Sequence, residues 1–337
     1  MERQSSIGDG QFPNRLLNAP QTLSMPHNGF IPNETPVPNH LNHPEDQILT
    51  GDLSVLDWFV NPGNLSVKID GAPSVGFGIN PATGKFAVAT KSFLNKKKIK
   101  IAHSHQEIDA FYNGEVAEIL HGLFDWAPRE YGVWIQADWI GFGGQSEYTP
   151  NTITYTFAGV IQEKIILSPH TMYWGTDNLN TCKSAPMNFI ITDTPYVKFV
   201  KPDAYIAHGQ TSFADVKEVC DFARQMSTAC EFVSDKQAAK IKQQLNALIR
   251  AGEQITVENV NEFDCDPNLI RLWALVKSIK DDCLYLCRND GPAAYINGNR
   301  IDAEGYVMSN EFGMFKLVNR EVFSYHNFNS GRFQVCQ

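Results

Sequence analysis

Short segments with strand-like apolar patterns recur through the first half of the chain. Apolar residues at every second position are typical of antiparallel strands, whose successive side chains point to opposite faces of a sheet. A turn at residues 81–84 predicts that the strands on either side of it pair as a hairpin. The expected strands are residues 65–69, 74–79, 86–90, 133–140 and 153–161.

Apolar residues three or four positions apart, which is helical spacing, mark other segments. This spacing predicts a short helix at residues 52–59 and a longer one at residues 108–124. From about Thr211 three more helices are expected, and the second opens with the capping box Ser234-Asp235-Lys236-Gln237. Strand patterns return at residues 294–296, 305–308 and 315–318.

These changes of pattern divide the chain into three parts. Residues 1–48 are rich in proline and asparagine and poor in bulky aliphatic residues, which indicates an extended arm or a disordered tail. Residues 49–210 and 288–337 carry the strands, and residues 211–287 form a helical insertion between them. Because the apolar stripes of these helices can bury against one another, we expect the insertion to fold as a compact accessory unit.

Composition narrows the class of protein. A chain of 337 residues with 43% hydrophobic content can bury a sizeable core, and no apolar run reaches the length of a membrane span. The net charge of −9 argues against a basic coat for bulk nucleic-acid binding but allows a local basic groove. Seven scattered cysteines without a C-x-x-C pair support neither a disulfide framework nor a zinc site, which fits a reducing cytoplasm.

Three short motifs carry the candidate chemistry. Lys68-Ile69-Asp70-Gly71 follows an expected strand, Glu304-Gly305-Tyr306-Val307 lies far downstream, and an apolar-flanked lysine, Lys316, comes shortly afterwards. In this order the trio resembles the covalent nucleotidyltransferase superfamily, which comprises ATP-dependent DNA and RNA ligases and mRNA capping enzymes. The first two motifs also have plainer interpretations: an exposed Asp-Gly turn and a solvated glutamate at a strand end.

The resemblance implies a fold and a domain organisation. The expected fold is α+β, an ATP-grasp-like nucleotidyltransferase fold in which two antiparallel sheets flank an ATP cleft, with a helical insertion. Residues 49–210 and 288–337 would form the nucleotidyltransferase domain. The short segment after Lys316 is too small for the oligonucleotide-binding barrel of DNA ligases and capping enzymes, so the chain is most similar to phage RNA-ligase-like proteins.

The resemblance also implies a reaction and roles for residues. The amine of Lys68 would attack the α-phosphate of ATP and form a lysyl–AMP intermediate, and only a neutral amine is nucleophilic. Asp70 would orient the site, Gly71 would allow the backbone to turn beside the phosphates, and Lys316 would bind phosphate. Glu304 would face a divalent metal, Mg²⁺ or Mn²⁺, that arrives with ATP.

Weaker matches lie between these motifs. Lys91 follows a strand where the family places a residue that contacts the nucleotide or the nucleic-acid end. Asp138 stands where the family has a ribose-holding glutamate, and it is a second candidate for the metal. Phe157, with Tyr155 beside it, is a candidate to stack on adenine, although core aromatics are more common. In the family a second lysine often lies two positions from the first, but Met314 and Val318 occupy those positions around Lys316.

The expected partner is the 5′-phosphate end of a nucleic acid, RNA rather than DNA, with no membrane. One alternative is an enzyme with the same first step that passes AMP to a protein or a small molecule. The other is a degenerate member of the family, or a phage structural protein, that only binds nucleotide or nothing. The basic run Lys96-Lys97-Lys98 is either a solvated face or a track for a phosphate backbone. We expect the accessory helices to bind the acceptor and the first chemical step not to need them.

Overall fold

A computed structural model describes residues 41–61, 63–175, 178–179, 181–187, 190–207, 213–260 and 263–329. The chain divides into two units, residues 1–31 and residues 32–337, and every described residue belongs to the second. Most of the arm predicted for residues 1–48 therefore lies outside the described residues. No helix among the described residues is long and apolar enough to cross a membrane.

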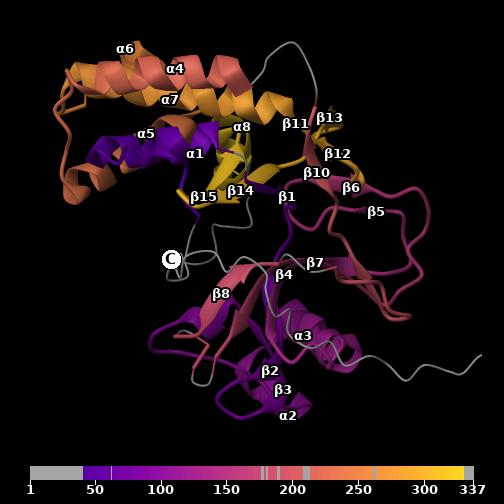
Figure 1. Cartoon of the computed structure of the whole chain (residues 1–337). Coiled ribbons are helices and arrows are strands. Elements are labelled where there is room, and N and C mark those ends of the chain that lie inside the picture. Colours follow the sequence, from indigo (N-terminus) through magenta and orange to yellow (C-terminus); the bar gives the residue numbers. More distant parts are fainter. Residues whose placement is uncertain are drawn as a thin grey trace, which may run out of the picture. The chain divides into compact units, whose positions relative to one another are not determined.

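Groups of strands and groups of helices follow one another along the described chain (Figure 1). The helices are η1 (Pro44–Thr50), α1 (Ser54–Val60), η2 (Lys91–Leu94), α2 (His105–Phe111), α3 (Gly114–Trp126), α4 (Phe213–Ser227), α5 (Asp235–Ala251), α6 (Val257–Val260), α7 (Pro267–Leu286) and α8 (Arg320–Asn329). The strands are β1 (Asn64–Lys68), β2 (Ser74–Asn80), β3 (Lys85–Thr90), β4 (Trp134–Phe142), β5 (Glu147–Tyr148), β6 (Thr154–Thr156), β7 (Ile165–Trp174), β8 (Lys183–Pro186), β9 (Val197–Phe199), β10 (Ala204–Ile206), β11 (Cys287–Asn289), β12 (Ala293–Ile296), β13 (Asn299–Ile301), β14 (Gly305–Asn310) and β15 (Gly313–Val318).

The fold is α+β with antiparallel sheets, which confirms the predicted class. Among the described residues the strands form four sheets rather than two. The largest has the order β3-β2-β4-β7-β8, with β9 paired in parallel to β7, and a second has the order β1-β14-β15. The smaller sheets are β13-β12-β6-β5 and β10-β11.

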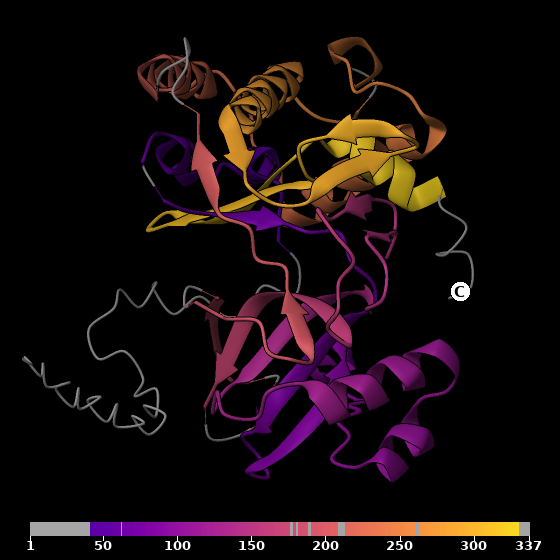
Figure 2. The same cartoon turned by 90° about the vertical axis from the view of Figure 1, so that its right-hand side faces the viewer.

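Helix α3 covers one face of the six-stranded sheet. Ile119, Leu120 and Leu123 of α3 lie in one core cluster with Phe77 of β2 and Ile135 of β4. Figure 2 shows α3 lying across these strands. Since residues alternate between the two faces of a strand, the even-numbered residues of β4 point to the face opposite α3.

The β1-β14-β15 sheet uses its odd and even positions in different ways. Tyr306, Phe315 and Leu317 point to one face and are buried against helices α1, α4, α5 and α7 in a single core cluster that includes Trp273. The helices between residues 213 and 286 therefore pack on this sheet and on α1 as well as on one another. Their core is shared with the strands, so the expectation of an independently compact accessory unit does not match the packing.

Several predicted elements differ in length. The helix expected at residues 108–124 is two helices, because Tyr112 and Asn113 are extended and end α2 before α3 begins. The strand expected at residues 153–161 is only β6. The capping box is confirmed, since the side chain of Ser234 accepts a hydrogen bond from the backbone N–H of Gln237.

Candidate functional site

Lys68 and Glu304 meet although 236 residues separate them in the sequence. Lys68 is the last residue of β1 and pairs with Gly305, the first residue of β14, which places Glu304 at the same end of the sheet. The Lys68 Nζ and a Glu304 carboxylate oxygen are 2.5 Å apart. The Lys68 side chain is 31% exposed and that of Glu304 is 7% exposed, so the pair is accessible from the lysine side.

Gly305 is required beside this pair. Its φ of +153° and its approach to β15 leave no room for a side chain, since a Cβ would lie 2.3 Å from the Leu317 carbonyl oxygen. A glycine here lets the chain enter β14 at the position paired with Lys68, with Glu304 immediately before it.

Lys316 lies on the same face of the β1-β14-β15 sheet as Lys68. It is paired with Val307, and Val307 with Ser66, which is two residues before Lys68 on β1. Directly paired residues share a face, and so do residues two apart on one strand. The flanking Phe315 and Leu317 are buried on the other face, as the alternation around Lys316 predicts. The three motifs are therefore gathered on one face of one sheet.

Asp70 holds a neighbouring loop in place. One of its carboxylate oxygens accepts a hydrogen bond from the Asn151 side chain at 2.9 Å, and the other accepts from the backbone N–H of Thr152 at 2.9 Å. The backbone N–H of Asp70 donates to the Tyr155 hydroxyl at 2.6 Å. Because its oxygens accept hydrogen bonds from these donors, Asp70 ties the segment after Lys68 to residues 151 and 152.

Gly71 lies against β4. A Cβ at this position would be 2.6 Å from the Trp139 carbonyl oxygen and 2.9 Å from the Asp138 Cβ. The next residue, Ala72, donates its backbone N–H to that same carbonyl at 3.0 Å. Close backbone approach, rather than a left-handed turn, is what calls for glycine here.

Gly71→Ala is expected to destabilise the fold by roughly 1–3 kcal/mol, because the added methyl group pushes the Lys68 segment away from β4. Urea unfolding would measure the change. Gly159→Ala is the matched control, since nothing lies within 4 Å of its Cβ position. Equal stability of the two variants would show that the contact with β4 is unimportant.

Asp138 approaches the site from the six-stranded sheet. It pairs with Ser74 of β2 and, being even-numbered on β4, points away from α3. Burial raises the pKa of Asp138 to about 7, although the positive charge of Lys68 opposes this shift. The carboxyl group therefore exchanges its proton near neutral pH.

His170 was not predicted from the sequence, and a β-bulge presents it. On β4, Gln136 pairs with Thr171 and Ala137 pairs with Pro169, so His170 is the extra residue of β7. Its Nε2 lies 3.9 Å from an Asp138 carboxylate oxygen. Burial and the charges of Lys68 and Lys91 lower the pKa of His170 to about 4, so the ring is neutral at pH 7. The proline within an apolar strand was the available signal, because proline in a sheet often marks a bulge.

The other predicted residues lie at the edges of this group. Lys91 begins η2, and its charge acts on both Asp138 and His170. Phe157 follows β6, is half-buried and packs edge-on against Tyr148. Tyr155 is 1% exposed, so the expectation that it could stack on adenine is wrong. Its hydroxyl holds the backbone of the Lys68 motif instead.

The charges of the group act on one another. Burial favours a neutral Lys68, but the carboxylates of Glu304, Asp138 and Asp70 outweigh it and raise the pKa of Lys68. Burial likewise raises the pKa of Glu304 against the influence of Lys68. Burial, together with the positive charges of Lys68 and Arg320, lowers the pKa of Lys316 to about 8. Without ligand, Lys68 is thus an ammonium ion held by Glu304.

No protein-only metal cage is found in the described part of the chain. Nowhere in it do three or more His, Cys, Asp or Glu side chains converge on a point that could hold a metal ion. Asp138 and Glu304 both act electrostatically on Lys68 and supply hard carboxylate oxygens. They suit an ion that keeps most of its ligands from water and phosphate, as Mg²⁺ does.

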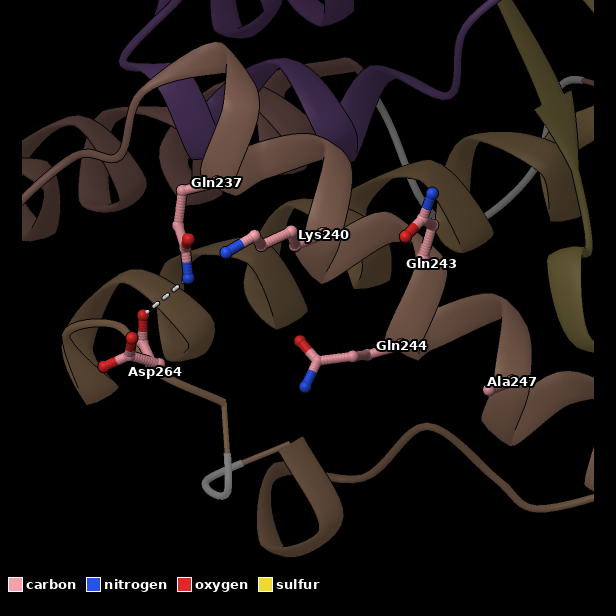
Figure 3. Close-up of a pocket in the computed structure, with 6 residues that line it drawn as sticks. All are labelled: Gln237, Lys240, Gln243, Gln244, Ala247 and Asp264. Atoms are coloured by element: carbon pink, nitrogen blue, oxygen red, sulfur yellow. Dashed lines mark hydrogen bonds between the residues drawn. The ribbon is translucent and has the colours of Figure 1, made fainter.

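A separate pocket of about 490 Å³ opens on helix α5 (Figure 3). The amides of Gln237, Gln243 and Gln244 line it together with Lys240, Ala247 and Asp264. It contains no residue of the three motifs, so it lies apart from the group around Lys68.

The chain belongs to a family of unknown function (DUF6267), whose model matches residues 38–267 and 257–332. Neither the curated proteins nor the solved structures include a match to the chain.

Proposed function

We propose that this protein is an ATP-dependent nucleotidyltransferase of the RNA-ligase-like kind. The observation that carries the proposal is the contact of Lys68 with Glu304, with Lys316 on the same face of the sheet. In lysyl–AMP formation Lys68 would be the nucleophile, Glu304 the carboxylate on the metal side and Lys316 the cation that binds phosphate. ATP would lie between the β1-β14-β15 sheet, which carries these residues, and the six-stranded sheet, which carries Asp138 and His170.

In the first step Lys68 Nζ bonds to the α-phosphorus of ATP, the bond from that phosphorus to the bridging oxygen breaks, and pyrophosphate leaves. Lys68 must first lose a proton, which would pass to water, since its side chain is 31% exposed. Its interaction with Glu304 opposes that loss, so the amine stays inactive until the carboxylate turns to another cation. Lys316 would bind the phosphates, and positioning of this kind supplies most of the catalysis of phosphoryl transfer.

Asp138 and Glu304 would hold Mg²⁺ or Mn²⁺ together with the nucleotide. When bound, such an ion neutralises phosphate charge and competes with Lys68 for the carboxylate of Glu304. Two carboxylates leave the other coordination positions to water and phosphate oxygens, so these residues fit an ion that arrives with ATP. Neutral His170, next to Asp138, can donate one hydrogen bond or accept one without adding charge.

The second step would transfer AMP to the 5′-phosphate of a polynucleotide, RNA rather than DNA, before sealing. Lys91 supplies positive charge beside Asp138 and His170 for such a substrate. The exposed Lys96, Lys97 and Lys98, which follow β3, would add contacts with its phosphate backbone. A reducing, cytoplasmic setting suits the buried thiols of Cys220, Cys283 and Cys287, whose pKa values burial raises. The enzyme would work in the host cytoplasm if a phage encodes it.

Incubation of the purified chain with α-labelled ATP and Mg²⁺ or Mn²⁺ tests the first step, and adding 5′-phosphorylated RNA or DNA tests the second. Label on the protein that moves to RNA supports the whole proposal. If the protein is labelled but neither RNA nor DNA removes the label, the AMP acceptor is a protein or a small molecule instead. Failure to label with either metal would reject the enzymatic function.

Lys316→Met is expected to weaken ATP binding by roughly 10- to 100-fold, because a charge-assisted contact with phosphate is lost. The same change should raise the melting temperature at pH 7, since burial disfavours this ammonium ion in the folded chain. The folded chain releases this proton above pH 8 and the unfolded chain only near 10.5, the ordinary lysine pKa. As the pH rises from 8 to 10.5, the folded wild type no longer carries the buried charge that destabilises it. The difference in melting temperature between Lys316→Met and the wild type should therefore shrink over this range.

Lys316→Arg is the matched control because arginine keeps its charge at these pH values. It should show no thermal gain at pH 7. If Lys316→Met binds ATP with the affinity of the wild type, Lys316 does not contact the phosphates.

A further inference from the structure

A second cluster of titratable side chains joins helices α2 and α3, outside the site described above. His105 is the first residue of α2 and Asp109 lies one turn later. His121 and Asp125 lie one turn apart on α3. Each histidine reaches the aspartate of the other helix: His105 Nε2 is 3.0 Å from Asp125 Oδ1, and His121 Nε2 is 2.8 Å from Asp109 Oδ1.

The other two ring nitrogens face each other. The Nδ1 atoms of His105 and His121 are 2.7 Å apart, and the two ring planes are inclined by 23° with their centres 4.9 Å apart. At this separation two nitrogen lone pairs repel unless a hydrogen or a metal ion lies between them. Phe124 packs edge-on against the His105 ring.

We propose that His105 and His121 form a binding site for a late first-row transition-metal ion such as Zn²⁺, Ni²⁺ or Cu²⁺. Imidazole nitrogens suit these ions, whereas Mg²⁺ prefers oxygen. A metal-binding histidine almost always donates its other ring N–H to a carboxylate or a carbonyl group, which directs the remaining nitrogen to the metal. Asp125 and Asp109 stand in this relation to the two histidines.

The cluster can open enough to admit an ion. Two nitrogens bound at about 2.0–2.1 Å to a tetrahedral ion lie roughly 3.3 Å apart, so the Nδ1 atoms must separate by roughly 0.6 Å. The side chains of His105 and His121 are 47% and 29% exposed, which leaves them free to make this small rotation and open to ions from solution. Binding releases the hydrogen that lies between the nitrogens in the metal-free chain.

Two protein nitrogens leave the remaining coordination positions to water or to a ligand from another molecule. No third His, Cys, Asp or Glu side chain converges with them within the described ranges. The site is therefore an open one, suited to an exchangeable ion rather than to a permanent structural metal, and moderate affinity is expected. It shares no residue with the Lys68 group, so it stands or falls independently of the proposed reaction.

Calorimetric titration of the full-length, untagged chain with Ni²⁺, and separately with Zn²⁺, tests the site. The wild type should bind one ion that is lost in His105→Ala and in His121→Ala. Asp109→Asn and Asp125→Asn should weaken binding roughly 10- to 100-fold, as loss of a carboxylate that orients a histidine ligand does. Circular dichroism would verify that each variant keeps its helices.

His103→Ala is the matched control, because both nitrogens of that ring contact other residues, namely Glu107, Asn80 and Thr83. It should bind Ni²⁺ as the wild type does. If an alanine variant loses its helices, His105→Asn and His121→Asn, which keep a side-chain N–H, replace it. Absence of binding by the wild type, or unchanged binding in the double variant His105→Ala/His121→Ala, would overturn the proposal.

Discussion

Glu304→Gln is expected to slow formation of the covalent adenylate by roughly 10²–10³, the usual effect of removing one preorganised electrostatic group from a reaction site. Glu304 is buried and contacts Lys68 directly, and it is one of the two carboxylates that we propose as metal ligands. Rates measured with saturating ATP and Mg²⁺ would give the change. Glu311→Gln, at the exposed turn of the same β14–β15 hairpin, is the matched control and should react as the wild type does.

The same variant should make Lys68 more reactive towards a general amine reagent. Glu304 is the principal carboxylate that raises the pKa of Lys68, and burial alone would lower it. Glutamine removes the negative charge, so a larger fraction of the amine is neutral at a given pH. Slower adenylylation together with faster chemical modification would separate a specific role of Glu304 from simple misfolding. If both rates stayed at wild-type values, Glu304 would have no part in the site.

Trp273→Ala is expected to cost about 3–5 kcal/mol of unfolding free energy, as deletion of a buried tryptophan side chain does. Trp273 is 1% exposed on α7, in the core that also contains Tyr306 and Phe315 of the site's own sheet. Because the core is shared, adenylylation should be lost at the temperature at which the variant unfolds. Replacement of residues 213–286 with a Gly/Ser linker should likewise abolish adenylylation.

Tyr285→Ala provides the control on the same helix. Tyr285 is 74% exposed, so its replacement should change stability by less than about 0.5 kcal/mol. Urea unfolding of both variants gives the comparison. If the linker variant stays folded and still forms the adenylate, the helices are a separate accessory module that the first step does not need.

Local patterns predicted those elements whose signals lie within a few residues. The hairpin of β2 and β3, the Ser234 cap and the alternation around Lys316 all depend on neighbours in the sequence. The ten-residue strand β7 was missed because Pro169 interrupts its pattern, and its pairing with β4 absorbs the proline at a bulge. The shared core was missed for a related reason: apolar stripes do not say which partner covers them.

The candidate site shows the same division. The order of three motifs predicted that Lys68, Glu304 and Lys316 belong together, and pairing between β1, β14 and β15 brings them to one face. His170 could not be predicted, because its direction depends on a bulge defined by two strands that are distant in the sequence. The hydrogen bonds from residues 151–153 to Asp70 likewise require the tertiary fold.

We expect Lys68 to become covalently adenylylated, and the intact mass of the chain after incubation with ATP and Mg²⁺ or Mn²⁺ would show whether it does. The wild type should gain the mass of one adenylyl group, and peptide mapping should place that group on Lys68. Lys68→Ala should gain nothing, while Lys85→Ala, which replaces an exposed lysine on β3, should behave as the wild type does. An adduct that persists in Lys68→Ala, or a wild type that gains no mass with either metal, would show that Lys68 is not adenylylated.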